Sequence, residues 1–326
     1  TGITGYKRKP LQKRALDMMR PDVSFVLPVY NKASVLPYFF ESLLAQTGDV
    51  SFEVIFIDDV STDNSLEILN EYAGSHDFVR VINNEVNTGP SIRLNQGAAE
   101  AKGKYLALFD CDEILAPDAL KTMLSLAKQQ GADMVHGRGR KTNAPIEDFM
   151  AEPIGENFSF TIHNDPLDRI LGRGMVRMTW LVTQELFQRA EGCDETVFVQ
   201  DESLALRLAS KARRIVDADM TVTMVPDMGS HISQNTLQLN HDRFLVYLNF
   251  LQAHSELSSD LRIRIYQKCI SAVKKARKDD APFAAIPVLT RYVMGKIGFV
   301  DPAPESLMYY RNIFYELPNI RRVEEK

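Results

Sequence analysis

The sequence has no apolar run approaching the roughly 20 residues that a membrane-spanning helix requires, and its N-terminus lacks the apolar core of a signal peptide. The three cysteines are odd in number and lack the paired CxxC spacing of zinc or redox sites, which favours a reducing compartment. A formal net charge of -5 argues against a nucleic-acid partner, whose phosphates require a basic surface. We therefore expect a cytoplasmic protein, peripheral at the inner face of a membrane if it contacts one. Because the chain begins at Thr1 and not at a methionine, the possibility that it is an excised part of a longer multidomain chain also stays open.

Two common nucleotide-binding motifs are also missing. No GxGxxG follows the first apolar run, and no GxxxxGK[ST] occurs in the chain. The usual dinucleotide and P-loop folds are excluded on this ground, so any nucleotide must be held by other groups.

Short apolar runs alternate with stretches of helical periodicity. The pattern predicts strands at 23–29, 52–57, 78–82 and 105–109, with helices at 33–46, 64–72, 91–101 and 117–129. Strands that alternate with helices form a mainly parallel sheet covered on both faces. The predicted fold class is therefore α/β.

The character of the chain changes at three points. Residues 1–21 are basic and indicate an extension or linker, while 137–175 are polar and rich in glycine, which indicates loops. From about residue 236 to residue 326 the periodicity is helical. We expect an α/β domain over 22–235, divided into a ligand-binding part at 22–125 and a second part at 126–235, followed by a helical region.

Acidic side chains follow the predicted strands, at the sheet edge where α/β proteins bind ligands. Asp110 and Asp112 lie two residues apart, so a continuing strand would place both on one side, where carboxylates suit Mg²⁺ or Mn²⁺ bridging a diphosphate. Tyr30 is a candidate to stack on a base, and Asp59 to accept a hydrogen bond from an imide N–H. For each residue a plain structural role, packing or helix capping, stays open.

Three segments together resemble the nucleotide-binding half of family 2 glycosyltransferases with the GT-A fold. The segments are VSFVLPVYNK, FEVIFIDDVSTDNSLEIL and NTGPSIRLNQGAAEAKGKYLALFDCDEILAPDAL, and the likeness covers about residues 22–125. The resemblance implies a GT-A α/β fold followed by the C-terminal helical region. It also implies a nucleotide site and a metal site made by the following residues: Pro28, Tyr30, Asn31, Asp59, Arg93 and Asp110 for the nucleotide, and Asp112 with Asp110 for Mn²⁺ or Mg²⁺.

The resemblance continues more weakly into the second half, where Val199-Gln200-Asp201-Glu202 is similar to the family's motif at the head of a helix. It implies that Asp201 is the catalytic base, with Glu202 as the alternative if the register slips by one. Gln200 replaces the usual acid before the base. A carboxylate at a helix N-terminus also has a simple capping role, which stays an alternative.

Two further residues are candidates with strong alternatives. Relatives often supply a histidine near the end of this domain; the simplest alignment places it at Met228, whereas the available imidazole is His231. Trp180, the only tryptophan, is a candidate to stack on an acceptor sugar, against the alternative of a core aromatic.

The resemblance implies an activity: inverting transfer of a hexosyl or N-acetylhexosaminyl group from a UDP-sugar to a hydroxyl of a glycan or lipid-linked glycan, as in bacterial polysaccharide biosynthesis. A catalytically degenerate nucleotide- or glycan-binding module and a sugar-nucleotide nucleotidyltransferase are the alternatives. The stretch 261–278 has seven Lys or Arg and no acid, with Leu261, Ile265, Ala272 and Ala276 on one stripe. It is either a helix in peripheral contact with an anionic membrane or the solvated face of a helical subdomain.

Overall fold

The first half of the chain folds into a parallel sheet. The computed structural model describes residues 20–142, 146, 151–173, 177–226, 235–279, 281–296, 302–318 and 320–321. The four parallel strands are β1 (Val23–Val29), β2 (Phe52–Asp58), β3 (Val79–Asn83) and β4 (Tyr105–Leu108), linked by α2 (Leu36–Leu44), α3 (Ser65–Ser75) and α4 (Pro90–Glu100). These bounds confirm the predicted alternation to within a few residues.

The two faces of this sheet bury separate apolar clusters. Phe25 and Leu27 point to one cluster, where α2 and α5 (Ala119–Gln130) pack, while Val26 and Ile57 point to the other, which α4 and α8 (Gln200–Lys211) cover. Alternate side chains of a strand point to opposite faces, and a strand covered on both sides is apolar throughout. Continuous runs such as VSFVLPV are therefore the sequence signature of this arrangement.

Beyond β4 the sheet becomes mixed. Its order is β3-β2-β1-β4-β8-β6-β9-β5, with β7 also paired to β9. The added strands are β5 (Ile114–Leu115), β6 (Met134–Thr142), β7 (Phe160–His163), β8 (Trp180–Thr183) and β9 (Ile215–Pro226). β8 runs antiparallel to both β4 and β6, whereas β6 and β9 run parallel to each other.

The expectation of loops over 137–175 is wrong for β6, β7 and α6 (Pro166–Arg173). Gly137 lies within β6, and a Cβ at this position would lie 2.5 Å from a methyl of Val222 on β9. Glycine is thus required there by the close packing of β9, not by a turn.

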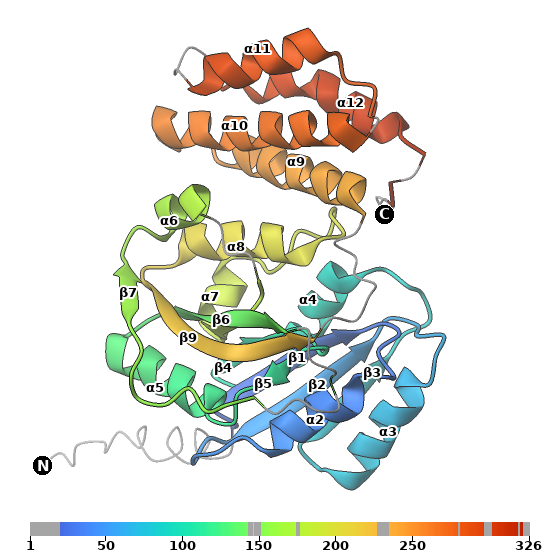
Figure 1. Ribbon diagram of the computed structural model, residues 1–326, viewed down its shortest axis with the longest axis vertical. Coiled ribbons are helices and arrows are strands. Elements are labelled where there is room, and N and C mark those ends of the chain that lie inside the picture. The colour runs from blue at the N-terminus through green and yellow to red at the C-terminus, as the bar shows by residue number, and fades with distance from the viewer. Residues whose placement is uncertain are drawn as a thin grey trace, which may run out of the picture.

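Four helices complete the fold, and Figure 1 shows them stacked beyond α8 on one side of the sheet. They are α9 (Thr236–Ala253), α10 (Ser259–Ala276), α11 (Ala285–Lys296) and α12 (Met308–Glu316), with short 3-10 turns η3 (Arg277–Asp279) and η4 (Pro304–Leu307). The stripe that includes Ile265, Ala272 and Ala276 is buried, so α10 uses it for packing and does not present it to a membrane surface. Within the described residues, no helix is long and apolar enough to cross a membrane.

Candidate active site

The loops that follow β1 and β2 are hydrogen-bonded to each other. Asn31, at a positive φ of 53°, accepts a hydrogen bond from the amide of Thr62 at 2.7 Å and donates its own amide to Ser61 Oγ at 3.0 Å. The amide of Lys32 donates to Ser65 Oγ at 2.7 Å. The two loops therefore form one structure at the carboxyl edge of the sheet, and Tyr30 projects from it with 47% of its side chain exposed.

Asp59, directly after β2, is buried and fixed by hydrogen bonds. Its Oδ1 accepts from Arg93 Nε at 2.7 Å and from the amide of Thr88 at 2.9 Å, and its Oδ2 accepts from the amide of Gly89 at 2.8 Å. The following residue, Val60, has a φ of 64°, which a β-branched residue rarely adopts. Such strain costs about 1–3 kcal/mol and concentrates at functional sites.

Arg93 supports this loop with its whole guanidinium group. Besides Asp59, it donates to the side-chain oxygens of Asn84 at 2.9 Å and Gln96 at 3.0 Å and to the carbonyl of Val86. Its predicted contact with a diphosphate stays a prediction; in the structure it orients the Asp59 carboxylate.

Asp110 and Asp112 lie in a turn, because β4 ends at Leu108 and the amide of Glu113 donates to the Asp110 carbonyl at 3.2 Å. The strand alternation that we used to place both acids on one side is therefore wrong, although the turn still brings them together. Lys32 forms an ion pair with Asp112, and Arg177 donates to Glu113 at 3.3 Å.

The charges in this turn are poorly compensated. Burial, and then the negative charges of Asp112 and Asp201, raise the pKa of Asp110 to about 7. Burial and then the charge of Asp110 raise the pKa of Glu113 to about 8. The positive charges of Lys32 and Arg177 thus offset only part of the effect of burial and of the neighbouring negative charges on these carboxyl groups.

Asp201 lies in the first turn of α8, close enough for its charge to act on Asp110. Burial, followed by the charge of Glu202, raises the pKa of Asp201 to about 6. Its carboxylate accepts a hydrogen bond from the amide of Glu202 at 2.8 Å. The structure therefore brings a carboxylate with an elevated pKa from the second half within electrostatic range of the acidic turn from the first half.

A buried residue that the sequence reasoning missed holds the start of α8. Asp242 on α9 accepts hydrogen bonds from the amides of Phe198 at 3.0 Å and Val199 at 2.8 Å, directly before Asp201. The available signal was the polar string Asn240-His241-Asp242-Arg243 inside a helix that is otherwise largely apolar. Lys32 and Arg177 were likewise not predicted.

The remaining candidates are placed differently. Glu202 forms an ion pair with Arg243 at 2.6 Å. Trp180 is fully buried on β8, as the alternative of a core aromatic describes, and its ring is not exposed to an acceptor sugar. His231 and Met228 lie outside the described residues.

The acidic turn fits a divalent cation by its chemistry. Within the described residues, no group of three or more His, Cys, Asp or Glu side chains is arranged around a metal position. Mg²⁺ and related cations are often held by one or two carboxylates together with substrate phosphates, so two acids suffice. Asp112, already paired with the Lys32 ammonium, and Asp110, with its elevated pKa, are the residues that fit such an ion.

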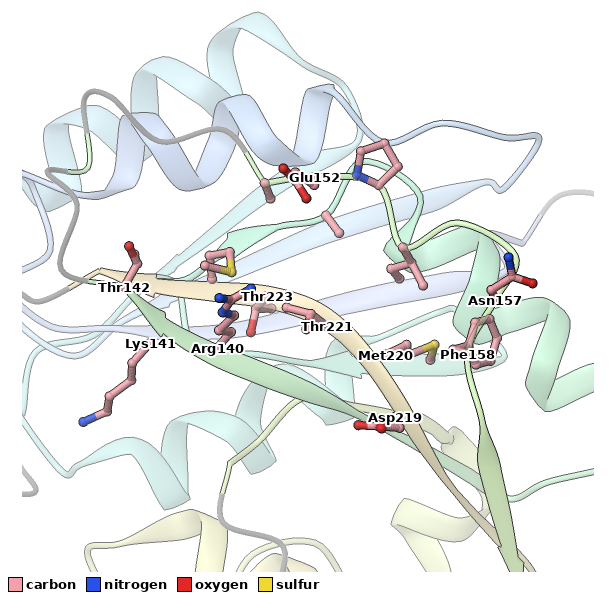
Figure 2. A pocket seen from close by; sticks show the side chains of 15 residues that line it. Arg140, Lys141, Thr142, Glu152, Asn157, Phe158, Asp219, Met220, Thr221 and Thr223 are labelled. Carbon is pink, nitrogen blue, oxygen red and sulfur yellow. The ribbon is translucent and has the colours of Figure 1, made fainter.

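A polar cavity of about 590 Å³ is lined by Ala116, which follows β5, and by Thr223 and Met224, which pair with β5. Figure 2 shows Arg140 and Thr223 on the β6–β9 ribbon at one side of it, and Glu152 and Asn157 on the segment that crosses opposite. Among the residues that the structure describes, the Arg140 side chain has no hydrogen-bond or ion-pair partner. The cavity therefore presents free polar groups suited to a hydroxylated ligand.

Comparison with known proteins agrees with this geometry. A sequence model of the family described as "Glycosyl transferase family 2" matches residues 24–189, about half of the chain. The chain belongs to glycosyl transferase family 2. The match includes every strand and loop of the carboxyl edge up to β8.

The curated relatives match over part of their length. The poly(ribitol-phosphate) beta-glucosyltransferase of Bacillus spizizenii is 35% identical over 123 residues, which are 37% of this chain and 19% of the relative. Glycosyltransferase GlyG of Streptococcus pneumoniae is 32% identical over 136 residues, 42% of this chain and 45% of the relative. In both cases the match spans less than half of the relative.

Solved structures show the same fold at low identity, which supports the GT-A architecture for nearly the whole chain. S. aureus TarS 1–349, in complex with UDP-GlcNAc, superposes with a TM-score of 0.63 at 16% identity, covering 90% of this chain and 88% of that one. The mannosyltransferase PcManGT of Pyrobaculum calidifontis, in complex with GDP-Man and Mn²⁺, gives 0.52 at 16% identity, covering 92% and 86%.

Proposed function

We propose that this family 2 protein transfers a sugar from a UDP-sugar to a hydroxyl of a glycan acceptor, with inversion at the anomeric carbon. The observation that carries the proposal is the approach of Asp201 to the acidic turn at Asp110. A base and a diphosphate-binding edge must both lie close to the anomeric carbon, and these two groups come from distant parts of the chain. The two relatives described above, which are similar in sequence over part of this chain, are glycosyltransferases by name, and this agrees with the proposed activity.

The edge made by the loops after β1 and β2 is the proposed donor site. Tyr30 is exposed and available to stack on a base, and Pro28 and Asn31 belong to the same segment of the chain. Asp59 already accepts three hydrogen bonds and has capacity for one more, which suits a uracil imide N–H. The fixed orientation of this carboxylate supports recognition because no side chain must be ordered when the base binds.

Asp201 is the proposed general base. A sugar hydroxyl is a poor nucleophile until its proton is accepted as it attacks the anomeric carbon. With a pKa of about 6, Asp201 is mostly ionised at pH 7 and yet basic enough to take that proton. The hydroxyl oxygen then forms the bond to the anomeric carbon as the bond to the diphosphate oxygen breaks, the diphosphate keeps the electron pair, and the configuration inverts.

Asp112 and Asp110 would hold Mn²⁺ or Mg²⁺. When bound, such an ion supplies positive charge that stabilises the departing diphosphate. Lys32, paired with Asp112, adds a further positive charge on the same side. Burial, and then the negative charges of Asp112 and Asp201, disfavour the ionised form of Asp110, and a bound cation would favour it. We therefore expect UDP to bind more tightly when the cation is present.

The polar cavity is the proposed site for part of the acceptor glycan. It is lined by Ala116, directly after β5, and Arg140, Asn157 and Glu152 offer hydrogen-bond donors and acceptors to sugar hydroxyls. Lipid-linked acceptors are included in the proposal, since the cavity would contact only the glycan.

A donor panel tests the proposal. The protein is incubated with UDP-, GDP- and dTDP-sugars, with Mn²⁺ or Mg²⁺ and candidate glycans, and released nucleotide and pyrophosphate are measured. Acceptor-dependent release of UDP is expected. Pyrophosphate exchange would instead indicate a nucleotidyltransferase, and UDP binding without any turnover across the panel would indicate a binding module.

A further inference from the structure

Helix α11 exposes an apolar face at one end of the molecule. Ile286, Leu289 and Val293, spaced three and four residues apart, share one side of the helix and are 79%, 44% and 54% exposed, with Met294 beside them at 36%. The opposite side packs on α10 through Val288. Figure 1 shows α11 at the upper end of the long axis, farthest from the sheet.

No charged side chain interrupts the face within the described part of α11. Its sole described charge, Arg291, points inward, where it donates to the hydroxyl of Tyr266 at 2.8 Å and to the carbonyl of Ser306 at 2.9 Å. Four large apolar side chains in contact with water on one helix make a contiguous patch that soluble surfaces usually avoid.

The segment that contains the patch is rich in positive charge. Residues 259–296 contain nine Lys or Arg and three Asp, although the whole chain carries a net charge of -5. Lys274 lies over the ring of Tyr292 on α11, 3.9 Å from the centroid, which brings an ammonium to the flank of the helix. Lys275, Arg277 and Lys278 are exposed at the end of α10 and in η3, and none has an acidic partner among the described residues.

We propose that this face of α11 docks on an anionic lipid membrane, with Ile286, Leu289, Val293 and Met294 entering the interfacial layer and the neighbouring basic residues contacting lipid headgroups. An apolar helical face flanked by Lys and Arg has the composition of interfacial helices. A second copy of the chain fits less well, because pairing two such faces would bring two basic clusters together. The inference is independent of the catalytic proposal.

Vesicle co-sedimentation tests the proposal with the whole chain. Wild type is expected to bind vesicles of phosphatidylglycerol and phosphatidylcholine and to bind pure phosphatidylcholine far more weakly. Ile286→Glu with Val293→Glu should reduce the partition coefficient on the order of tenfold or more. Lys275→Gln with Arg277→Gln and Lys278→Gln should reduce it on the order of a hundredfold on anionic vesicles, with little change on neutral ones.

Leu44→Glu is the matched control, since Leu44 is an equally exposed apolar residue, 51%, on α2. It should bind vesicles like wild type. Thermal unfolding shows that each variant is folded, and light scattering reports the oligomeric state. The proposal is overturned if wild type does not bind anionic vesicles, if the α11 variants bind as well as Leu44→Glu, or if the α11 substitutions only dissociate a dimer.

Discussion

The carboxylates Asp59 and Asp201 are held in opposite ways. Asp59 accepts three hydrogen bonds from the protein and pairs with buried Arg93, whereas Asp201 has no cation within ion-pair distance among the described residues and its pKa is raised to about 6. A carboxylate held by several hydrogen bonds has a fixed orientation, which suits the proposed recognition of a base. A carboxylate that is desolvated and weakly paired is reactive toward protons. In the proposed function, this difference separates the part of the protein that binds the donor from the part that reacts.

The largest expected effect comes from Asp201. We expect Asp201→Asn to reduce kcat by about a thousandfold, because an amide does not accept a proton near neutral pH. The affinity for UDP should stay within about twofold of the wild-type value. Steady-state UDP release and UDP titration check the two parts. Glu202→Gln is the matched control, and it should retain most activity because Glu202 is engaged by Arg243. Equal losses in both variants would remove Asp201 from its role.

A substitution in the binding half should have the reverse profile. Asp59→Asn leaves Arg93 without its buried partner, so we expect the free energy of unfolding to fall by about 3 kcal/mol and UDP affinity to fall by about tenfold or more. Chemical denaturation and UDP titration measure these effects. Asp77→Asn, at an exposed position directly before Phe78 and β3, is the control and should change both quantities little. Unchanged UDP affinity in Asp59→Asn would contradict the donor-site assignment.

The pH dependence of kcat/KM should sharpen the contrast. The base acts in its ionised form, so the rate should fall about tenfold per pH unit as Asp201 is protonated below its pKa of about 6. The free energy of unfolding should depend on pH in the opposite direction to the rate. The raised pKa means that the folded protein binds the proton of Asp201 more tightly than the unfolded chain does, so the contribution of Asp201 to stability declines as pH rises from about 4 to about 6. A rate that is flat between pH 5 and 7 would refute the assignment.

The smallest expected effect concerns the cavity. Arg140→Ala should raise the KM for the acceptor about fivefold, as loss of one or two hydrogen bonds would, without changing UDP affinity. Lys211→Ala, a surface basic residue at the far end of α8, is the control and should have no effect. Kinetics at varied acceptor concentration measure the change. A rise in the KM for the donor instead would reassign the cavity.

The sequence predicted the first half of the fold well because its strands are buried on both faces and are therefore apolar throughout. It failed at β6, where Gly137 and several polar residues lie in a strand, because the glycine is required by Val222, which is distant along the chain. Asp110 and Asp201 were identified as candidates from local motifs. Lys32, Arg177 and Asp242 were not, since their roles depend on partners that only the folded chain brings close.

The anomeric configuration of the product tests the account most directly. The protein is given an α-linked UDP-sugar and an acceptor, and the new linkage is examined by NMR. One displacement with Asp201 as base predicts a β-linked product. An α-linked product would contradict that mechanism, since retention requires a different course at the anomeric carbon.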